Sequence, residues 1–433
     1  MPRHWVPFYR QILFAVLTTL FPGAYNKLKI KTGKEGCAVK RSLCLLTTFL
    51  LLFAVCAGCA SSSNAPQSSA PTTQTTQQTA PTESIQPTYP VQIAESTFPE
   101  PLLRQQATQA DADGDGTLTQ EEAQAVTQME LKKLLDDPDG LEGAPRPVYT
   151  AGDFTFDLEG IQYFTGLTDL TVNMLGGEIF VQEQPEDILA VVKHFENIYA
   201  CTALQKLTLS EIDADGLDTS RFPNLTRLSL NCMYNLSALK VGDPITSLWI
   251  FGCNKLTQLD LANAASLTEL NLVSNAALST VRFSKANEQI KIIQLNELYS
   301  LQEIDLSLLK NLKQLDILGA ALTDIDVSQN AALEQFCAED LALDTLDLRN
   351  NPNISYIING KDSFKNILLA DDNRVTMIRW TDAPITQFPI TNLNPDTLEG
   401  IDIQGTAIRE LDVSAYPKLQ YLYYDEDVTT IIK

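Results

Sequence analysis

The chain has 433 residues and a formal net charge of -23 at pH 7, and 44% of its residues are hydrophobic. A chain of this length and composition can bury a large apolar core. Its acidity argues against a nucleic-acid-binding protein, which needs a basic surface, and is itself typical of a solvated exterior.

The first 38 residues fit neither a signal peptide nor a folded domain. Basic residues are scattered through this segment, and its apolar stretch from Ile12 to Phe21 is short. If translation starts at Val39 through an alternative start codon, Lys40 and Arg41 open the product directly ahead of an apolar run. Residues 1–38 are therefore interpreted as untranslated or, alternatively, as an atypical leader.

Residues 39–58 are predicted to form a lipoprotein signal peptide. The apolar run from Leu43 to Val55 is too short to span a membrane, which takes about 20 residues, and it suits a signal-peptide core. It ends in Cys56-Ala57-Gly58-Cys59, which resembles the lipobox of bacterial lipoproteins, although that family prefers Leu or Val where Cys56 stands. The resemblance implies that Cys59 receives the lipid. The alternatives are an ordinary cleaved signal and an uncleaved anchor.

Residues 59–97 are predicted to form a disordered linker. Ser, Thr, Gln, Ala and Pro dominate this segment, and apolar residues are few. Such a composition cannot bury enough surface to fold. The linker would hold the folded part of the protein away from the membrane.

Residues 98–137 are predicted to contain a calcium site. Carboxylates stand at alternate positions, followed by a glycine, an apolar residue and a closing glutamate, and this pattern matches the EF-hand calcium loop. The expected ligands are the side chains of Asp111, Asp113 and Asp115, the carbonyl oxygen of Thr117, a water held by Thr119, and both carboxylate oxygens of Glu122. The alternative is an acidic turn that holds no metal.

Two helices are expected to flank the calcium loop, from Pro99 to Gln109 and from Glu121 to Leu135. Gly116 would permit the sharp turn of the loop, and Leu118 would pack inward. EF-hands usually occur in pairs, but the sequence Asp213-Ala214-Asp215-Gly216 lacks the closing acid and is interpreted as a turn. A single site predicts modest affinity, suited to extracellular calcium.

Residues 138–203 are predicted to form a cap and a first repeat, with insertions at 138–156 and 176–202. The second insertion has apolar residues at helical spacing, at Ile188, Val191, Val192 and Phe195. His194 would lie on this helix as a surface or packing residue.

Residues 204–433 repeat with a period of about 21 residues. The apolar residues that mark the period are Leu207, Leu228, Leu248, Leu270, Ile293, Leu315 and Phe336. A second apolar series with the same period lies half a turn away, so each coil should carry two short extended segments. Because one coil cannot bury its apolar edge alone, stability must come from stacked neighbours.

These repeats resemble the leucine-rich repeat family, in the short form found in internalin-like bacterial surface proteins. The resemblance covers roughly residues 158–433 and implies a solenoid of short β-strands, loops and turns behind a small helical calcium segment. Asn275, Asn330 and Asn351 stand where a side-chain amide can bond to the backbone at the corner of a coil. Surface proteins of this kind place a calcium loop before the first repeat, so the loop should cap the open end of the solenoid.

Four cysteines follow Cys59, and none of their spacings predicts a metal clip. Cys232 and Cys253 stand about one repeat apart. This spacing fits either a disulfide between adjacent coils or two unbonded thiols.

Two sets of side chains are candidates for a binding surface. Trp249 stands at a strand position that should face solvent, although the 176–202 insertion could cover it. Its column would contain Thr208, Ser229, Asn271, Gln294 and Asp316. A second column should contain Asp260, Asp305, Asp326, Asp347, Asp402 and Asp412. Within it, Asp305, Asp326 and Asp347 either receive a basic partner or cations, or are simply common in this repeat type.

Enzyme activity is not expected. One histidine, His194, follows Cys59, and no nucleophile elbow, Gly-rich phosphate loop or histidine cluster appears. No small-molecule substrate is evident. A pair of carboxylates acting on a glycosidic bond is the one enzyme reading that composition leaves.

The expected protein is therefore a lipid-anchored binding protein, adhesin-like, on the extracellular face of a bacterial cell membrane. Its repeats would bind a protein or glycan on a host or neighbouring cell, and only the lipid would contact the membrane. The alternative is a structural envelope protein without a dedicated ligand, and a carbohydrate-active enzyme is a third possibility.

Overall fold

The computed structural model describes residues 87–132, 155–173, 190–341, 343, 345–361, 364–388, 390, 392–425 and 429–433. The expectations for residues 1–86, including the signal peptide and Cys59, fall outside the described residues. Most of the two insertions between 138 and 203 falls outside them too. Among the described residues no helix has both the length and the apolar character needed to cross a membrane.

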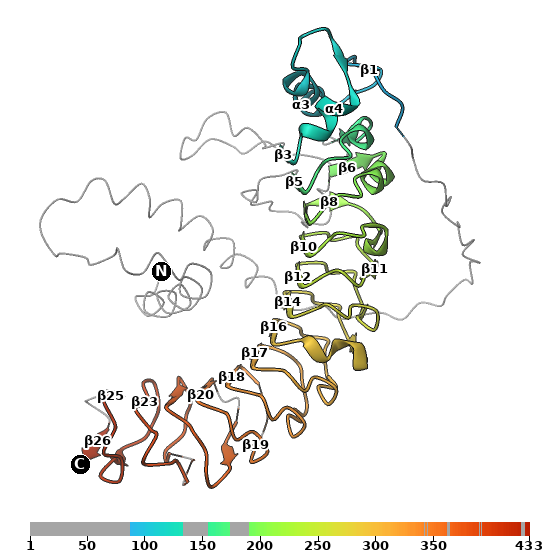
Figure 1. Cartoon of the computed structure of the whole chain (residues 1–433). Coiled ribbons are helices and arrows are strands. Elements are labelled where there is room, and N and C mark those ends of the chain that lie inside the picture. The colour runs from blue at the N-terminus through green and yellow to red at the C-terminus, as the bar shows by residue number, and fades with distance from the viewer. Residues whose placement is uncertain are drawn as a thin grey trace, which may run out of the picture. The chain divides into compact units, whose positions relative to one another are not determined.

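Thirteen strands form one sheet in which every neighbouring pair is parallel (Figure 1). In chain order they are β3 (Gln128–Lys132), β5 (Asp169–Asn173), β7 (Lys206–Ser210), β10 (Arg227–Asn231), β12 (Ser247–Phe251), β14 (Glu269–Val273), β16 (Ile292–Asn296), β17 (Gln314–Leu318), β18 (Gln335–Glu339), β20 (Tyr356–Gly360), β22 (Met377–Thr381), β23 (Gly400–Asp402) and β25 (Tyr421–Tyr423).

The pairing register confirms the repeat read from the sequence. Leu228 pairs with Leu207 on one side and Leu248 on the other. The remaining marks continue the same row through Leu270, Ile293, Leu315 and Phe336. The second and fourth residues of these strands are buried, because alternate side chains point into the coil.

A second row of short strands closes the coils. These strands form small parallel sheets: β4 (Thr155–Asp157), β6 (Ala190–Lys193) and β8 (Ile212–Asp213); β9 (Gly216–Asp218), β11 (Ala238–Lys240), β13 (Gln258–Asp260) and β15 (Thr280–Arg282); β19 (Thr345–Leu348) and β21 (Asn366–Leu369); and β24 (Glu410–Asp412) and β26 (Thr430–Ile432). Leucine and isoleucine fill the space between the two rows. The chain is thus a leucine-rich repeat solenoid, as predicted.

Buried asparagines tie successive coils together at their corners, as the sequence indicated. The Asn330 side-chain amide donates to the carbonyls of Leu306 and Leu309, at 2.9 and 2.8 Å. Asn275 and Asn351 make equivalent bonds to backbone of the preceding coil. These amides satisfy carbonyls that would otherwise be buried without a partner.

A left-handed residue follows most of the main strands, and the sequence pattern did not reveal it. The residues with positive φ at this position are Glu211, Cys232, Gly252, Ser274, Glu297, Gly319, Asp340, Lys361, Asp382 and Gly405. This conformation aims the backbone N–H at the next strand: that of Glu297 donates to the Leu318 carbonyl at 2.7 Å. Because only three of these residues are glycine, no recurring residue type marks the turn.

The segment around the acidic loop contains less helix than expected. Helix α3 (Pro101–Ala110) precedes the loop, and the short α4 (Gln120–Ala125) follows it. The second helix was predicted to reach Leu135 but ends at Ala125, since residues 128–132 join the main sheet as β3 and pair with β5. In β3, Met129 and Leu131 are buried on the side facing the core.

Two further expectations are corrected. The linker does not extend to residue 97, because β1 (Val91–Gln92) pairs with β2 (Thr117–Leu118) and Phe98 is fully buried. The helix predicted in the second insertion is absent from the described residues 190–202. Strand β6 lies there between β4 and β8, followed by the 3-10 helix η5 (Phe195–Ala200).

Substitution of Gly319 tests the left-handed turn. Gly319 has φ 62°, and a Cβ there would find its nearest neighbour, in Tyr299, at 3.9 Å, so space is not limiting. Gly319→Ala should lower the free energy of unfolding by about 1 kcal/mol through backbone strain alone. Urea unfolding measures this loss.

Gly216→Ala is the matched control. Gly216 lies in β9 without a positive φ, and its added Cβ would make ordinary contacts at 3.6 and 3.8 Å with Ala238. Equal effects of the two substitutions would show that the left-handed turn is not what constrains Gly319.

Candidate functional site

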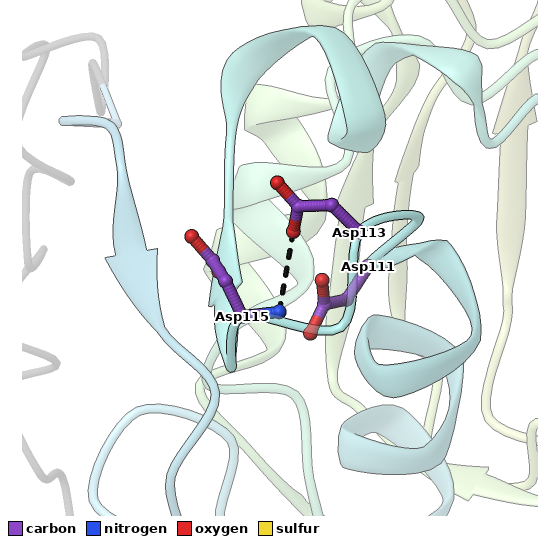
Figure 2. Close-up of side chains that lie close together, drawn as sticks. All are labelled: Asp111, Asp113 and Asp115. Carbon is purple, nitrogen blue, oxygen red and sulfur yellow. Dashed lines mark hydrogen bonds between the residues drawn. The ribbon is translucent and has the colours of Figure 1, made fainter.

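The acidic loop brings three carboxylates together. One oxygen from each of Asp111, Asp113 and Asp115 lies within 4.8 Å of the others, and no other such group of metal-ligating side chains occurs in the described part of the chain. Figure 2 shows the three side chains converging, with the backbone N–H of Asp115 donating to Asp113 Oδ1 at 3.2 Å. The predicted first three ligands are thus adjacent.

Glycine allows the loop to fold around Asp111. The backbone N–H groups of Gly114 and Gly116 donate to Asp111 Oδ1 and Oδ2, at 2.8 and 2.9 Å. Both glycines adopt positive φ, of 72° and 81°, which L-residues with side chains rarely take. Nothing lies within 4 Å of a Cβ at either position. The loop therefore holds its carboxylates through backbone donors on an open surface.

The later predicted ligands lie beside the three carboxylates. Asp115 Oδ1 accepts from the backbone N–H and the hydroxyl of Thr117, at 2.7 and 2.6 Å. Glu122 is not among the three converging carboxylates. Its Oε1 accepts from Ala112 N at 2.8 Å, and its Oε2 accepts from Thr119 N and Oγ1 at 2.9 and 2.7 Å. The bonds from Thr119 and Ala112 hold the pKa of the Glu122 carboxyl below its usual range.

The chain ahead of the loop supplies the strand with which the loop pairs. Val91 pairs with Leu118, and Gln92 pairs with Thr117. Ile93 N also donates to the Gly116 carbonyl at 3.0 Å, and Leu118 is fully buried. The loop therefore pairs with β1 and not with a second acidic loop. The sequence predicted that the residues of β1 belong to the linker.

The loop is joined tightly to the first repeat. A Cβ on Gly166, between β4 and β5, would lie 2.1 Å from the carbonyl oxygen of Gln124 in α4, so these backbones are in direct contact. Phe98 packs against Tyr163 and Phe164, with ring centroids 5.7 and 6.2 Å apart. The loop segment and the first repeat are therefore joined by both backbone and aromatic contacts.

Trp249 lies where the sequence placed it. It occupies the third position of β12, between Ser229 and Asn271 on the neighbouring strands, and it is half-buried. Leu248 and Ile250 on either side of it are fully buried. The 176–202 insertion, which could cover Trp249, is described only from residue 190 onward, so the role of Trp249 in binding stays a prediction.

The predicted aspartate column consists largely of corner residues. Asp305, Asp326 and Asp347 each accept a hydrogen bond, at 2.8 to 3.0 Å, from the backbone N–H two residues later. Hydrogen bonds from the side chains of Ser307, Ser328 and Arg349, followed by these backbone bonds, hold the pKa of the three carboxyls below the ordinary value. Asp260 and Asp412 make the same local bond. The recurrence of aspartate thus has a structural cause.

Asp402 does not belong to that column. It lies in β23 of the main sheet, where it pairs in register with Arg379. Its Oδ2 lies 3.2 Å from Arg379 Nε, and its side chain is only 7% exposed. The surrounding sequence Ile401-Asp402-Ile403 alternates between apolar and polar residues, as strands of both rows do. The sequence alone therefore did not show to which row Asp402 belongs.

His194 is an exposed surface residue, which is one of the two expected roles, and it lies beside two carboxylates and not on an α-helix. Its Nδ1 lies 2.7 Å from Asp157 Oδ1 and 3.9 Å from Glu159 Oε2. The bond to Asp157 raises the pKa of the imidazole. His194 adopts a left-handed conformation between β6 and η5. It therefore stabilises the junction of two coils.

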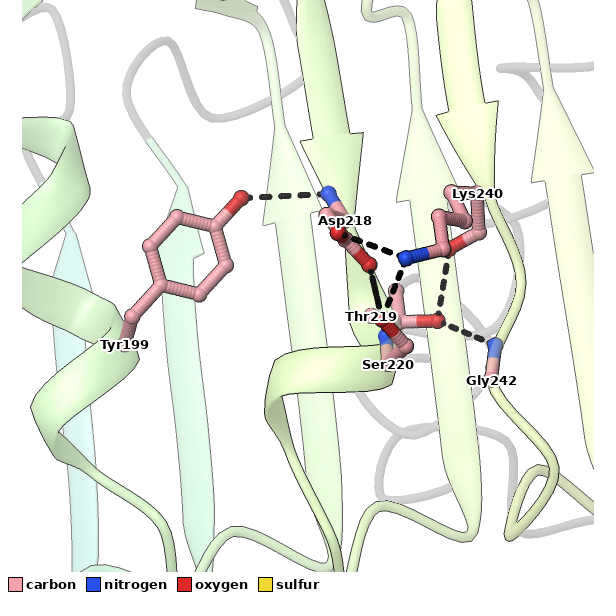
Figure 3. A network of polar contacts seen from close by, with 6 residues as sticks. All are labelled: Tyr199, Asp218, Thr219, Ser220, Lys240 and Gly242. Carbon is pink, nitrogen blue, oxygen red and sulfur yellow. Dashed lines mark hydrogen bonds and ion pairs between the residues drawn. The ribbon is translucent and has the colours of Figure 1, made fainter. Parts of the chain in front are cut away.

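A polar network that the sequence did not indicate joins three coils (Figure 3). Tyr199 accepts a hydrogen bond from Asp218 N at 3.1 Å, and the Arg221 guanidinium lies 3.7 Å from the centre of its ring. Lys240 Nζ pairs with Asp218 Oδ2 at 3.1 Å, while Thr219 Oγ1 donates to the Lys240 carbonyl at 3.0 Å. Because these groups satisfy one another, the network is a brace between coils.

No disulfide joins the cysteines in the described residues, including Cys232 and Cys253. Burial raises the pKa of the Cys253 thiol to about 12, with neighbouring Cys232 adding to the effect. A thiol with so high a pKa is a poor nucleophile.

No family model and no curated protein sequence matches the chain. Solved structures do match its fold. An internalin (InlF) from Listeria monocytogenes is 16% identical, covers 80% of this chain and 94% of its own, and gives a TM-score of 0.52. The functional domain of InlJ from Listeria monocytogenes is 18% identical, with 79% and 77% covered and a TM-score of 0.41. The likeness to InlF shows that the solenoid has the leucine-rich repeat fold of an internalin.

Substitution of Asp326 tests the corner role of the aspartates. Asp326→Ala removes the acceptor for the Ser328 N–H and should cost about 1 kcal/mol of unfolding free energy. Asp326→Asn keeps an acceptor oxygen and should cost less. Because folding lowers the pKa of Asp326, its charge stabilises the fold above the unfolded value of about 3.9, and this stabilisation is lost as pH falls further.

Urea unfolding of both variants between pH 3 and pH 7 measures these effects. The exposed Glu303, for which no local bond is found among the described residues, provides the control Glu303→Gln. A loss as large in the control as in Asp326→Ala would contradict the corner role.

Proposed function

We propose that this protein is a lipid-anchored surface protein whose leucine-rich repeat solenoid binds a protein partner. The observation that carries this proposal is the outward face of the main sheet. In β12, for example, the second and fourth residues fill the core, while Ser247, Trp249 and Phe251 stay partly exposed. A long row of such strands offers side chains that are free to vary without loss of the core.

The internalin fold supports a binding role, though only by analogy, since a fold does not fix a function. The corner carboxylates of Asp305, Asp326 and Asp347 accept backbone hydrogen bonds, which gives them a structural role in the coil. The proposal is therefore based on the surface of the sheet and not on a catalytic group.

The proposed anchor is the lipid on Cys59. The apolar run that ends at Cys59 and the polar segment after it support this arrangement. The polar segment would place the solenoid on the outer side of the membrane, at a distance set by its length.

We propose further that the acidic loop binds calcium and that calcium stabilises the N-terminal end of the solenoid. Asp111, Asp113 and Asp115 would hold the ion, with the Thr117 carbonyl and Glu122 completing the set. A hard cation with oxygen ligands suits the convergent carboxylates, which otherwise repel one another. Calcium would supply the positive charge at this point.

The contacts of the loop support a structural role for the ion. Its strand β2 holds β1, and its helix α4 lies against Gly166 of the first repeat. Tyr89, just before β1, donates to the Tyr163 carbonyl. An ordered loop thereby fastens residues 89–93 and α4 to the same end of the solenoid. Loss of the ion should loosen both.

Thermal unfolding of the full chain, with calcium and with chelator, tests the calcium proposal. Calcium at 100 times its dissociation constant should stabilise the protein by about 2.7 kcal/mol and raise the midpoint. Asp111→Asn, which keeps one of the two oxygens that accept from the Gly114 and Gly116 amides, should remove the rise. Limited proteolysis in chelator should also open residues 87–97 to cleavage.

Glu121→Gln is the control for that experiment. Glu121 is exposed and stands beside Glu122, but it occupies no ligand position in the loop pattern. An equal rise in midpoint for Asp111→Asn and the wild type, or no rise in either, would refute a calcium-stabilised cap.

Bacteria that express the full chain provide the test of surface binding. The protein should fractionate with membranes, be accessible to added protease and make the cells adhere to target cells. Cys59→Ser should release it into the medium and abolish adhesion, whereas Cys56→Leu, which restores the preferred lipobox residue, should not. Protease treatment of the target cells should abolish adhesion if the partner is a protein.

The other outcomes distinguish the alternatives. Loss of adhesion after glycosidase treatment alone would identify a glycan partner. A displayed protein that gives no adhesion to any cell type would favour the structural envelope protein.

A further inference from the structure

The outward side of the last main strands is aromatic. Tyr421 and Tyr423 occupy the first and third positions of β25 and are 48% and 49% exposed. Tyr356 and Met377 occupy the first positions of β20 and β22, and the row continues through Gly400 to Tyr421. We call Tyr356, Met377, Gly400, Tyr421 and Tyr423 the tyrosine face.

Gly400 makes this face continuous. A Cβ at Gly400 would lie 2.4 Å from Met377 Cε and 3.5 Å from Tyr421 Cβ. The Met377 side chain therefore extends from β22 over Gly400 in β23. It occupies space between β22 and β25 that a side chain at position 400 would otherwise fill. The thioether and the tyrosine side chains form one apolar strip, interrupted by no charged residue in that row.

An ion pair lies beside the strip in the third column. Arg379 Nε and Asp402 Oδ2 are 3.2 Å apart, and the side chains are 22% and 7% exposed. Tyr356 also bonds to the Arg379 guanidinium. The charge of Arg379 is thus neutralised in place. Tyrosine, methionine and arginine are the residue types enriched at the centres of protein interfaces.

Carboxylates surround the tyrosine face. Glu399 stands exposed immediately before β23. On the other side, Asp425 Oδ2 accepts from Gly405 N at 2.7 Å, and Asp382 and Glu339 lie near one another. Lys361 is the neighbouring cation, and Arg379 is already paired. The surroundings therefore carry an excess of negative charge, as the whole chain does.

We propose that the tyrosine face binds a protein partner through lysine or arginine side chains set among apolar residues. This inference rests on the proposed binding function and adds the position of the contact and the chemistry of the partner. The tyrosine rings would accept cations and their aliphatic stems. The carboxylates at the rim would attract and orient the same cations.

A phage-displayed library of random dodecapeptides, selected against the immobilised full chain, tests this proposal. Selected peptides should be rich in Lys or Arg together with apolar residues. A synthetic copy should bind Tyr421→Ala and Tyr423→Ala at least about tenfold more weakly than wild type. Glu399→Gln should weaken binding less, chiefly at low salt.

Tyr299→Ala is the matched control, since Tyr299 is 63% exposed but lies after β16, away from the tyrosine face. It should leave peptide binding unchanged. Because Tyr421 and Tyr423 are half exposed, the variants should also melt as the wild type does, which separates loss of binding from loss of fold.

Several results would overturn the proposal. Acidic or uncharged selected peptides would contradict the partner chemistry. Basic peptides that bind the tyrosine variants as tightly as wild type would contradict the position, while the proposed binding function, judged by cell adhesion, would stand. The library could yield no peptide whose binding depends on this face, while a glycan array yields a ligand whose binding does. The partner would then be a glycan and not a protein.

Discussion

Each coil of this protein depends on the next one for its core and for its hydrogen bonds. A main strand such as β10 has five residues and buries two side chains, and its backbone groups are satisfied by the strands beside it. The left-handed residue after the strand extends this dependence, since its N–H bonds to the following coil. A solenoid built this way has a stable interior and vulnerable ends.

At the N-terminal end of the solenoid, the outermost described strand has a neighbouring strand on one side only, and the acidic loop lies just before it in the chain. Strand β3 is the first of the main sheet, and it follows α4 after only two residues. The loop, the short helix and the first strand thus form one continuous segment, and β1 fastens the preceding chain to it. If calcium fixes the loop, as proposed, it also fixes the outermost strand. The ion would then act on stability and not on recognition.

The features that the sequence predicted are those that repeat. Leu207, Leu228 and Leu248 pair as expected because the core demands an apolar residue at each turn. The corner asparagines and the three adjacent aspartates of the loop were also found, since each residue type is tied to one backbone geometry. A sequence pattern predicts structure where the same physical requirement recurs in every repeat.

The features that the sequence missed are set by neighbours. The apolar residues Met129 and Leu131 suit a helix or a strand, and pairing with β5 selects the strand. Val91 and Ile93 are apolar residues in a polar segment, and their contacts with the loop and the core become evident only in the structure. Asp402 was predicted to lie in the second row of strands because polar and apolar residues alternate in the same way in both rows. The tyrosine face arises from residues about one repeat apart, none of which forms a motif.

Hydrogen exchange of the full chain, followed by mass spectrometry in calcium and in chelator, tests the central claim most directly. The account predicts that chelation exposes the amides of residues 91–93, the acidic loop and β3, while those of β12 to β18 keep their protection. Equal protection of the N-terminal end in both conditions would contradict it. So would a uniform loss along the whole solenoid, because the coils far from the loop would then depend on calcium as strongly as the cap does.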